Sequence, residues 1–132
     1  MLSYFDAINI ESLRSEFPVG ASFLNKFVGM SPASLRVWQE ALFAKQLKRA
    51  WQIPFYQRLW GEAGIRATDI QSLDDLSKLP SFGKHDIMAS VERKPPFGDH
   101  HGRDIPVDGK IVQMVLQSTS GTTGRTQPLL YS

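Results

Sequence analysis

The sequence of 132 residues contains no cysteine. Disulfides, cysteine-ligated zinc and thiol nucleophiles are therefore excluded from it, and the absence fits a reducing compartment. No apolar run approaches the ~20 residues that span a membrane. Residues 1–13 carry acids early and lack the basic segment and apolar core of a signal peptide. We therefore expect a cytoplasmic protein with no membrane partner.

The chain also lacks a strong charge of either sign. It has 15 Lys and Arg against 13 Asp and Glu, for a formal net charge of +2. The densest basic group, Lys45–Arg49, falls in a predicted helix, where we expect a solvated face rather than a partner or phosphate patch. This balance does not favour a nucleic-acid partner. An apolar content of 42% is ordinary for a globular protein.

Residues 1–90 predict mainly helices. Either Asn9 or Ser12 could cap a short helix that ends near Phe17. The strongest pattern covers 31–52, because Ser31 can accept an N–H bond as the cap and Pro32 suits the first turn.

Two further helices are predicted later in this half. Pro54 ends or kinks the long helix, and a shorter one follows over 55–65, with Gly64 at its left-handed end. Ser72 caps another over 72–79, with two acids in its first turn. The three tryptophans lie among leucines at helical spacing, which favours packing over an aromatic binding surface; they are Trp38, Trp51 and Trp60.

The composition changes after residue 90. Residues 91–109 are rich in Pro, Gly and Asp and predict an exposed loop. His100 and His101 lie in this loop near two aspartates, so a metal site is an alternative. Adjacent side chains of an extended loop point apart, however, which favours an exposed polar loop over convergent ligands.

Residues 110–132 predict a strand, a loop and a second strand. The apolar run from Ile111 to Leu116 is too short for a good helix, so Lys110–Ser118 is expected to be a buried strand. A second strand begins at Pro128. Together with the helical half, this makes the chain α/β. Because such a strand needs neighbours, we expect the C-terminal third to be mobile or exposed in this chain alone.

The loop between these strands has the composition of an anion-binding turn. Gly121 and Gly124 lack Cβ, so backbone N–H groups can approach a ligand closely. Arg125 adds a planar cation suited to phosphate. Hydroxyl donors come from Ser118, Thr119, Ser120, Thr122 and Thr123. The spacing matches neither the Walker-type loop nor the dinucleotide glycine pattern. A plain hairpin built from turn residues is the alternative.

Three segments in order carry a resemblance to a known family. "TSGTTGR", Thr119–Arg125, resembles the phosphate loop of adenylate-forming enzymes. "IPFYQRLWGEAGI", Ile53–Ile65, and "SLDDLSKLPSFGKHDI", Ser72–Ile87, resemble early segments of the phenylacetate-coenzyme A ligase family. In many relatives proline follows the second glycine sooner than Pro128 does here, and a lysine-like residue stands where this chain has Gln127.

The resemblance implies an AMP-forming acid–thiol ligase. ATP and Mg²⁺ would serve to activate a small-molecule carboxylate as an acyl-adenylate, which passes to coenzyme A. The phosphate-contacting residues would be Thr119, Ser120, Gly121, Thr122, Thr123 and Gly124, with Arg125 at a variable place. No catalytic residue or metal ligand is expected among the 132 residues.

Members of that family are several times longer than this chain. The resemblance therefore implies a fold of class α/β, with a mainly helical N-terminal half followed by the first strands of an adenylate-forming N-terminal domain. Residues 1–132 would be an incomplete part of that domain, inactive alone.

Lys84 and Asp86 match a Lys-x-Asp pattern of the family, and a helix-start or ion-pair role is favoured over catalysis. The competing function is a small non-catalytic helical module that binds a partner protein. Homo-oligomerisation is left open.

Overall fold

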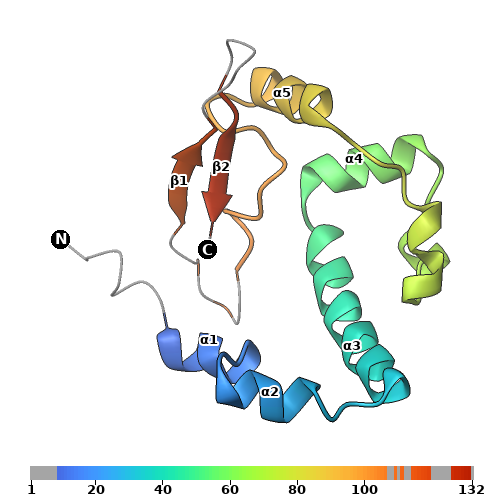
Figure 1. The fold of residues 1–132 in the computed structure, drawn as a ribbon. Coiled ribbons are helices and arrows are strands. Elements are labelled where there is room, and N and C mark those ends of the chain that lie inside the picture. The colour runs from blue at the N-terminus through green and yellow to red at the C-terminus, as the bar shows by residue number, and fades with distance from the viewer. Residues whose placement is uncertain (1–8, 107–108, 110, 112–113, 120–125, 132) are drawn as a thin grey trace. The chain divides into compact units, whose positions relative to one another are not determined.

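The computed structural model describes residues 9–106, 109, 111, 114–119 and 126–131. Figure 1 shows helices followed by one two-stranded sheet. The chain divides into two compact units, Met1–Leu42 and Phe43–Ser132. The elements are α1 (Ile10–Glu16), α2 (Ala21–Phe27), α3 (Pro32–Ala50), α4 (Pro54–Glu62), the 3₁₀ helices η2 (Ala67–Asp69) and η3 (Leu73–Lys78), α5 (Lys84–Arg93), β1 (Val115–Ser118) and β2 (Pro128–Tyr131).

The N-terminal unit contains short helices that begin where local signals place them. Of the two candidate caps for α1, Asn9 is the one used, because its Oδ1 accepts the amide of Ser12 at 2.9 Å. Helix α2 was not predicted from the sequence. It follows Gly20, whose φ of +59° is a left-handed conformation, and no side chain caps it.

Helix α3 confirms the prediction made from Ser31 and Pro32. The Ser31 Oγ accepts the amide of Ser34 at 3.1 Å, and Pro32 is the first helical residue. Trp38 packs edge-on against the ring of Phe27, with centroids 5.0 Å apart. In α1, α2 and α3, all of whose residues the structure describes, no side chain is buried. The described helices of the N-terminal unit therefore form no buried core.

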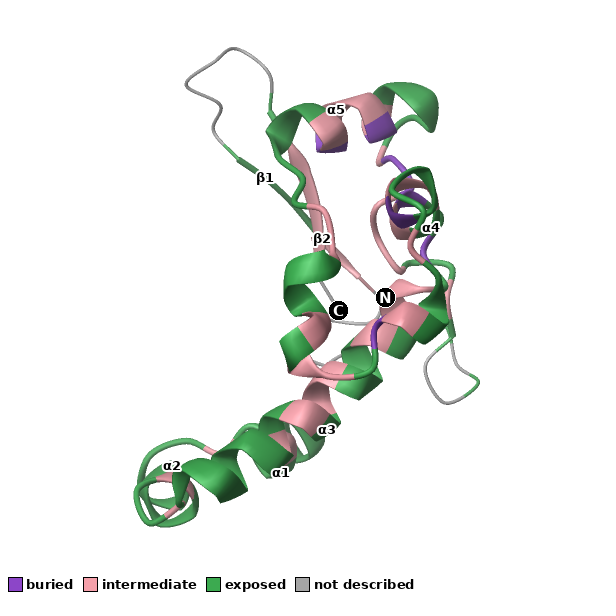
Figure 2. Ribbon diagram, turned by 90° about the vertical axis from the view of Figure 1, so that its right-hand side faces the viewer, coloured by how far each residue is buried: buried purple, intermediate pink, exposed green. Residues whose placement is uncertain are grey.

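The C-terminal unit contains the buried residues (Figure 2). Ile53, Phe55 and Ile87 form the central cluster, against which partly buried side chains pack. Trp60 is 5% exposed and meets Trp51 edge-on at 4.7 Å, which confirms a packing role for these two tryptophans. Pro54 is the first residue of α4, so it ends one helix and begins the next. Gly64 takes the left-handed conformation expected after α4, with φ +73°.

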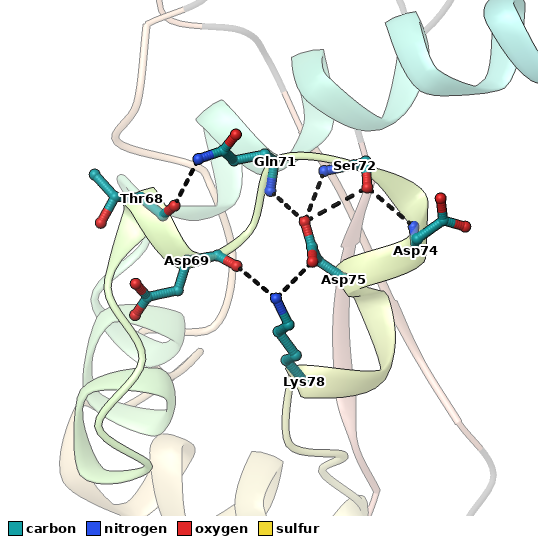
Figure 3. A network of polar contacts seen from close by, with 7 residues as sticks. All are labelled: Thr68, Asp69, Gln71, Ser72, Asp74, Asp75 and Lys78. Atoms are coloured by element: carbon teal, nitrogen blue, oxygen red, sulfur yellow. Dashed lines mark hydrogen bonds and ion pairs between the residues drawn. The ribbon is translucent and has the colours of Figure 1, made fainter.

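The helix predicted from Ser72 is the 3₁₀ helix η3. Residues in this helix and just before it form a network of polar contacts (Figure 3). The Asp75 carboxylate accepts the amides of Gln71 at 2.8 Å and Ser72 at 3.1 Å. Lys78 Nζ donates to the same carboxylate at 2.6 Å. The ammonium first, and then the backbone amides, lower the pKa of Asp75 to about 2. This segment is therefore fixed by local hydrogen bonds rather than by a buried face.

Helix α5 begins at Lys84, the first residue of the predicted Lys-x-Asp pattern, and Asp86 is its third residue. The Asp86 carboxylate accepts the amide of Gly83 at 2.8 Å, the N-terminal bond of a capping box. The helix-start role expected for Asp86 is thus confirmed. The helix itself extends to Arg93, into the segment expected to be loop.

The prediction of a buried strand over Lys110–Ser118 is wrong in burial and, at the described residues Ile111 and Met114, in extent. Lys110, Val112 and Gln113 lie outside the described residues. The strand observed is β1, Val115–Ser118, and Leu116 is 53% exposed. Ile111 lies outside it and is 63% exposed. The physical reason is that β1 pairs only with β2 in the described part of the chain, so no second layer covers its faces.

Candidate functional site

The predicted loop lies between two strands, as the sequence indicated, and the structure pairs these strands antiparallel. β1 and β2 pair in a register that sets Val115 opposite Tyr131 and Ser118 opposite Pro128. Pro128 has no N–H to donate, so the ladder cannot form a complete pair at that position. The strands are therefore held at their loop end by the pair that follows.

Thr119 and Gln127 form that closing pair. The Thr119 amide donates to the Gln127 carbonyl at 3.1 Å. In return the Gln127 amide donates to the Thr119 Oγ1, also at 3.1 Å, so a hydroxyl takes the place of a backbone carbonyl. The hydroxyl serves as an acceptor here, and its own proton can still be donated to a ligand. Gln127 thus has a structural role through its backbone.

Of the predicted phosphate-contacting residues, Thr119 is the one that the structure describes. Ser120, Gly121, Thr122, Thr123, Gly124 and Arg125 lie outside the described residues. The structure does describe the stem of the loop, which consists of the paired strands β1 and β2 and ends at the hydrogen-bonded residues Thr119 and Gln127.

A buried polar cluster in the same unit was missed by the sequence analysis. Asp99 is 7% exposed, although it lies in the segment expected to be an exposed loop. Arg58 from α4 donates two hydrogen bonds to its carboxylate, at 2.8 and 3.2 Å. Ser90 from α5 donates its hydroxyl to the carboxylate at 2.6 Å and accepts the Asp99 amide at 2.8 Å. The expectation of an exposed loop over 91–109 is therefore wrong at this point.

These contacts make Asp99 the residue that joins three segments. The guanidinium of Arg58 first, and the hydroxyl of Ser90, lower the pKa of Asp99 to about 2 despite its burial. The hydrogen bond with Asp99 raises the pKa of Arg58. The Asp99 carbonyl also accepts the amide of Phe55 at 3.3 Å. No spacing rule joins Arg58 to Asp99, because 41 positions separate them.

Gly98 is needed for this arrangement. Its φ is +83°, and a Cβ there would lie 2.7 Å from both the Ser90 Oγ and the His100 Nδ1. The position thus requires a left-handed backbone and also leaves no room for a side chain.

His100 adds an imidazole to the cluster. Its Nδ1 lies 3.4 Å from the Ser90 Oγ, and its ring meets that of Phe55 edge-on at 6.3 Å. Burial first, and then His101, lower the pKa of His100, so the neutral imidazole is favoured at neutral pH.

Neither histidine forms a metal site with its neighbours in the described part of the chain, where no three His, Asp or Glu side chains converge. His101 Nδ1 accepts the amide of Arg103 at 3.3 Å. No described helix is long and apolar enough to cross a membrane.

Comparison with known proteins identifies the class. No family model matches the chain. Phenylacetate-coenzyme A ligase of Pseudomonas putida is 30% identical over 100 residues, which are 75% of this chain and 20% of that protein. An open conformation of 2-hydroxyisobutyryl-CoA ligase, in complex with 2-HIB-AMP and CoA, matches with a TM-score of 0.60 and 28% identity, over 75% of this chain and 22% of that one.

The same ligase in its thioesterification state also matches with a TM-score of 0.60, at 31% identity over 75% of this chain and 20% of that one. The fold is therefore the α/β fold of acyl-CoA ligases, of which this chain spans about a fifth. Over three quarters of its own length, the chain is therefore similar to the phenylacetate-coenzyme A ligase family of adenylate-forming enzymes.

Proposed function

We propose that this chain supplies the pyrophosphate-binding loop of an AMP-forming acid–thiol ligase. In this proposal a carboxylate attacks the α-phosphate of ATP, and the acyl-adenylate then passes to coenzyme A. Thr119 to Arg125 contact the β- and γ-phosphates, which leave as pyrophosphate. The observation that supports it best is the match to CoA ligases over 75% of the chain.

The residues of the loop suit this task. Negative charge develops on the departing diphosphate, and backbone N–H groups, hydroxyls and a guanidinium directed at it stabilise that charge. Mg²⁺ bound to the nucleotide shares this stabilisation. The stem closed by Thr119 and Gln127 supports the proposal because it fixes both ends of the loop.

The chain spans about a fifth of the length of its relatives. We propose that the ligase activity belongs to a whole protein of their length. The partners proposed are a small carboxylate, a nucleotide and coenzyme A, in the cytoplasm. We expect the 132 residues to contact ATP without forming acyl-adenylate, since no catalytic residue is assigned to them.

A helical protein-interaction module is the second candidate, and exposed apolar side chains of the N-terminal unit favour it. Phe23 is 46% exposed, Leu24 55% and Val28 75%. This function requires no nucleotide, so nucleotide binding separates the two candidates.

The test is equilibrium binding of ATP and of AMP, each with Mg²⁺, to the full chain and to two variants. Thr122→Val removes a hydroxyl from the proposed loop, whereas Thr126→Val removes one just outside it and serves as the matched control. We expect ATP to bind in preference to AMP, and Thr122→Val to weaken ATP binding about 3- to 10-fold, the value of one hydrogen bond. Equal binding of AMP and ATP, or no binding at millimolar ATP, contradicts the proposal.

A further inference from the structure

Strand β1 has a free edge. In the described part of the chain the sheet consists of β1 and β2 alone (Figure 1), so each strand has one side without a neighbouring strand. Leu116, Gln117 and Ser118 of β1 are exposed, whereas Leu129 and Leu130 of β2 are half-buried. β1 is therefore the more accessible of the two strands.

The hydrogen-bond pattern of the hairpin defines which backbone groups point to that edge. The Thr119 amide donates to the Gln127 carbonyl at 3.1 Å, so these two residues form a hydrogen-bonded pair. In an antiparallel ladder such pairs alternate with pairs that share no hydrogen bond. In the observed register Leu116 and Ser118 fall in pairs of the second kind. The backbone N–H and C=O groups of these two residues therefore point away from β2.

The edge of β1 lacks the features that keep strands apart. The run Met114–Thr119 contains no charged residue, no proline and no glycine, and the register of β1 with β2 is continuous, without a bulge. Natural proteins block open edges with lysine, proline or bulges, and uncharged segments without them pair readily with other strands. In β2, by contrast, the residue opposite Ser118 is Pro128, which has no N–H to offer to a further strand.

A second copy of the chain is the partner that fits this edge. Two β1 edges present the same outward donors and acceptors, so they are complementary in an antiparallel pair related by a two-fold axis. Because neither edge carries a charge, no like charges are brought together. A two-stranded hairpin is only marginally stable, and joining two of them gives a sheet of four strands.

We propose that β1 is a self-association edge, through which two copies of this chain join their hairpins into one four-stranded antiparallel sheet. The proposal goes beyond nucleotide binding and does not rest on it, because it uses the outer edge of β1 rather than the loop. A strand of four residues buries less surface than a standard protein–protein interface. Association is therefore weak, with a dissociation constant on the order of 100 μM.

The first test is amide hydrogen exchange of the full chain at about 20 μM and at about 1 mM, below and above the expected dissociation constant. We expect exchange at Leu116 and Ser118 to slow about fourfold at the higher concentration, because only the dimer protects these amides. The amide of Leu130, which points to the free edge of β2, is the matched control and should not change. Exchange at Leu116 and Ser118 that is independent of concentration, or equal slowing at Leu130, overturns the proposal.

The second test is sedimentation equilibrium of the chain and its variants. Leu116→Pro removes an outward N–H and leaves the hydrogen bonds between β1 and β2, whereas Leu116→Thr keeps that N–H and is the matched control. We expect Leu116→Pro to raise the dissociation constant at least about 10-fold, since each copy loses one donor, and Leu116→Thr to stay within about threefold.

Protection of the Thr119 amide verifies that the hairpin of each variant is formed. Ser118→Pro removes the other outward N–H, so it should have the same effect as Leu116→Pro and decides the question if that variant loses its hairpin. A chain that stays monomeric at about 1 mM overturns the proposal, because it should then be mostly dimeric. Unweakened dimerisation of a proline variant whose hairpin is formed overturns it as well.

Discussion

The two compact units place similar residues in different surroundings. In the N-terminal unit, Leu13, Phe17 and Leu24 are each about half exposed. In the C-terminal unit, Phe55 and Ile70 are both 3% exposed. Both units obtain helices from local caps, but only the C-terminal one combines them with a buried cluster among the described residues. The comparison shows that local signals suffice to form a helix, whereas a fixed site needs contacts between distant segments.

The largest effect should come from the apolar core. Phe55→Ala removes a buried ring that contacts Tyr56, Phe82 and His100, and it should lower the free energy of unfolding of the C-terminal unit by about 4 kcal/mol. Leu24→Ala, in the N-terminal unit, should cost less than about 0.5 kcal/mol. Urea unfolding followed by amide exchange in α2 and α5 measures both. Equal costs would mean that the two units do not differ in packing.

The next effect concerns two arginine–carboxylate pairs. Arg58→Ala leaves Asp99 buried without its cation and should cost about 3 kcal/mol. Arg36→Ala breaks the exposed pair with Glu40, in which both side chains are 30% exposed or more, and should cost about 0.5 kcal/mol. The same unfolding measurement compares them. A loss below 1 kcal/mol for Arg58→Ala would show that the buried pair with Asp99 stabilises the fold no more than an exposed pair does.

Acid should weaken the C-terminal unit through Asp99. Its pKa is lowered to about 2 from 3.8, so the folded state favours the carboxylate. The stabilisation is therefore complete above about pH 4 and is lost as the pH falls through about 2. It amounts to roughly 2 kcal/mol at neutral pH. The unfolding free energy of Asp99→Asn should lack this part of the pH dependence. An identical acid profile in both proteins would exclude Asp99 as the source.

A smaller effect, alike in both units, is expected at two helix caps. Asn9→Ala and Ser72→Ala each remove a side-chain acceptor from a helix N-terminus, and each should cost about 1 kcal/mol of local helix stability. Amide exchange of Ser12 and Asp74, the donors concerned, is the measurement. A far greater loss at Ser72 would show that its cap depends on the unit around it.

The same contrast explains what the sequence could predict. Asn9, Ser31, Ser72 and Asp86 act within three residues of their partners, so their patterns are visible in the sequence. The two strands and the loop between them were also predictable. The buried strand was wrongly predicted, whereas the exposure expected for the C-terminal third agrees with Leu116, because burial depends on what else packs against a strand.

The cluster around Asp99 could not have been predicted from this sequence. Its segment is rich in Pro, Gly and Asp, which is the composition of an exposed loop. The residues that bury it come from α4 and α5, and the helix α5 was itself recognised only at its first turn.

The most direct test of the account is an NMR titration of the full chain with ATP and Mg²⁺. The loop from Thr119 to Gln127 is proposed to contact phosphate, and α1 and α2 are not. We predict shifts in the amides of Thr119, Gln127 and the loop between them at submillimolar to millimolar nucleotide, with α1 and α2 unchanged. No shift in the loop, or equal shifts in all of these segments, would contradict the claim that this hairpin binds the phosphates of a nucleotide.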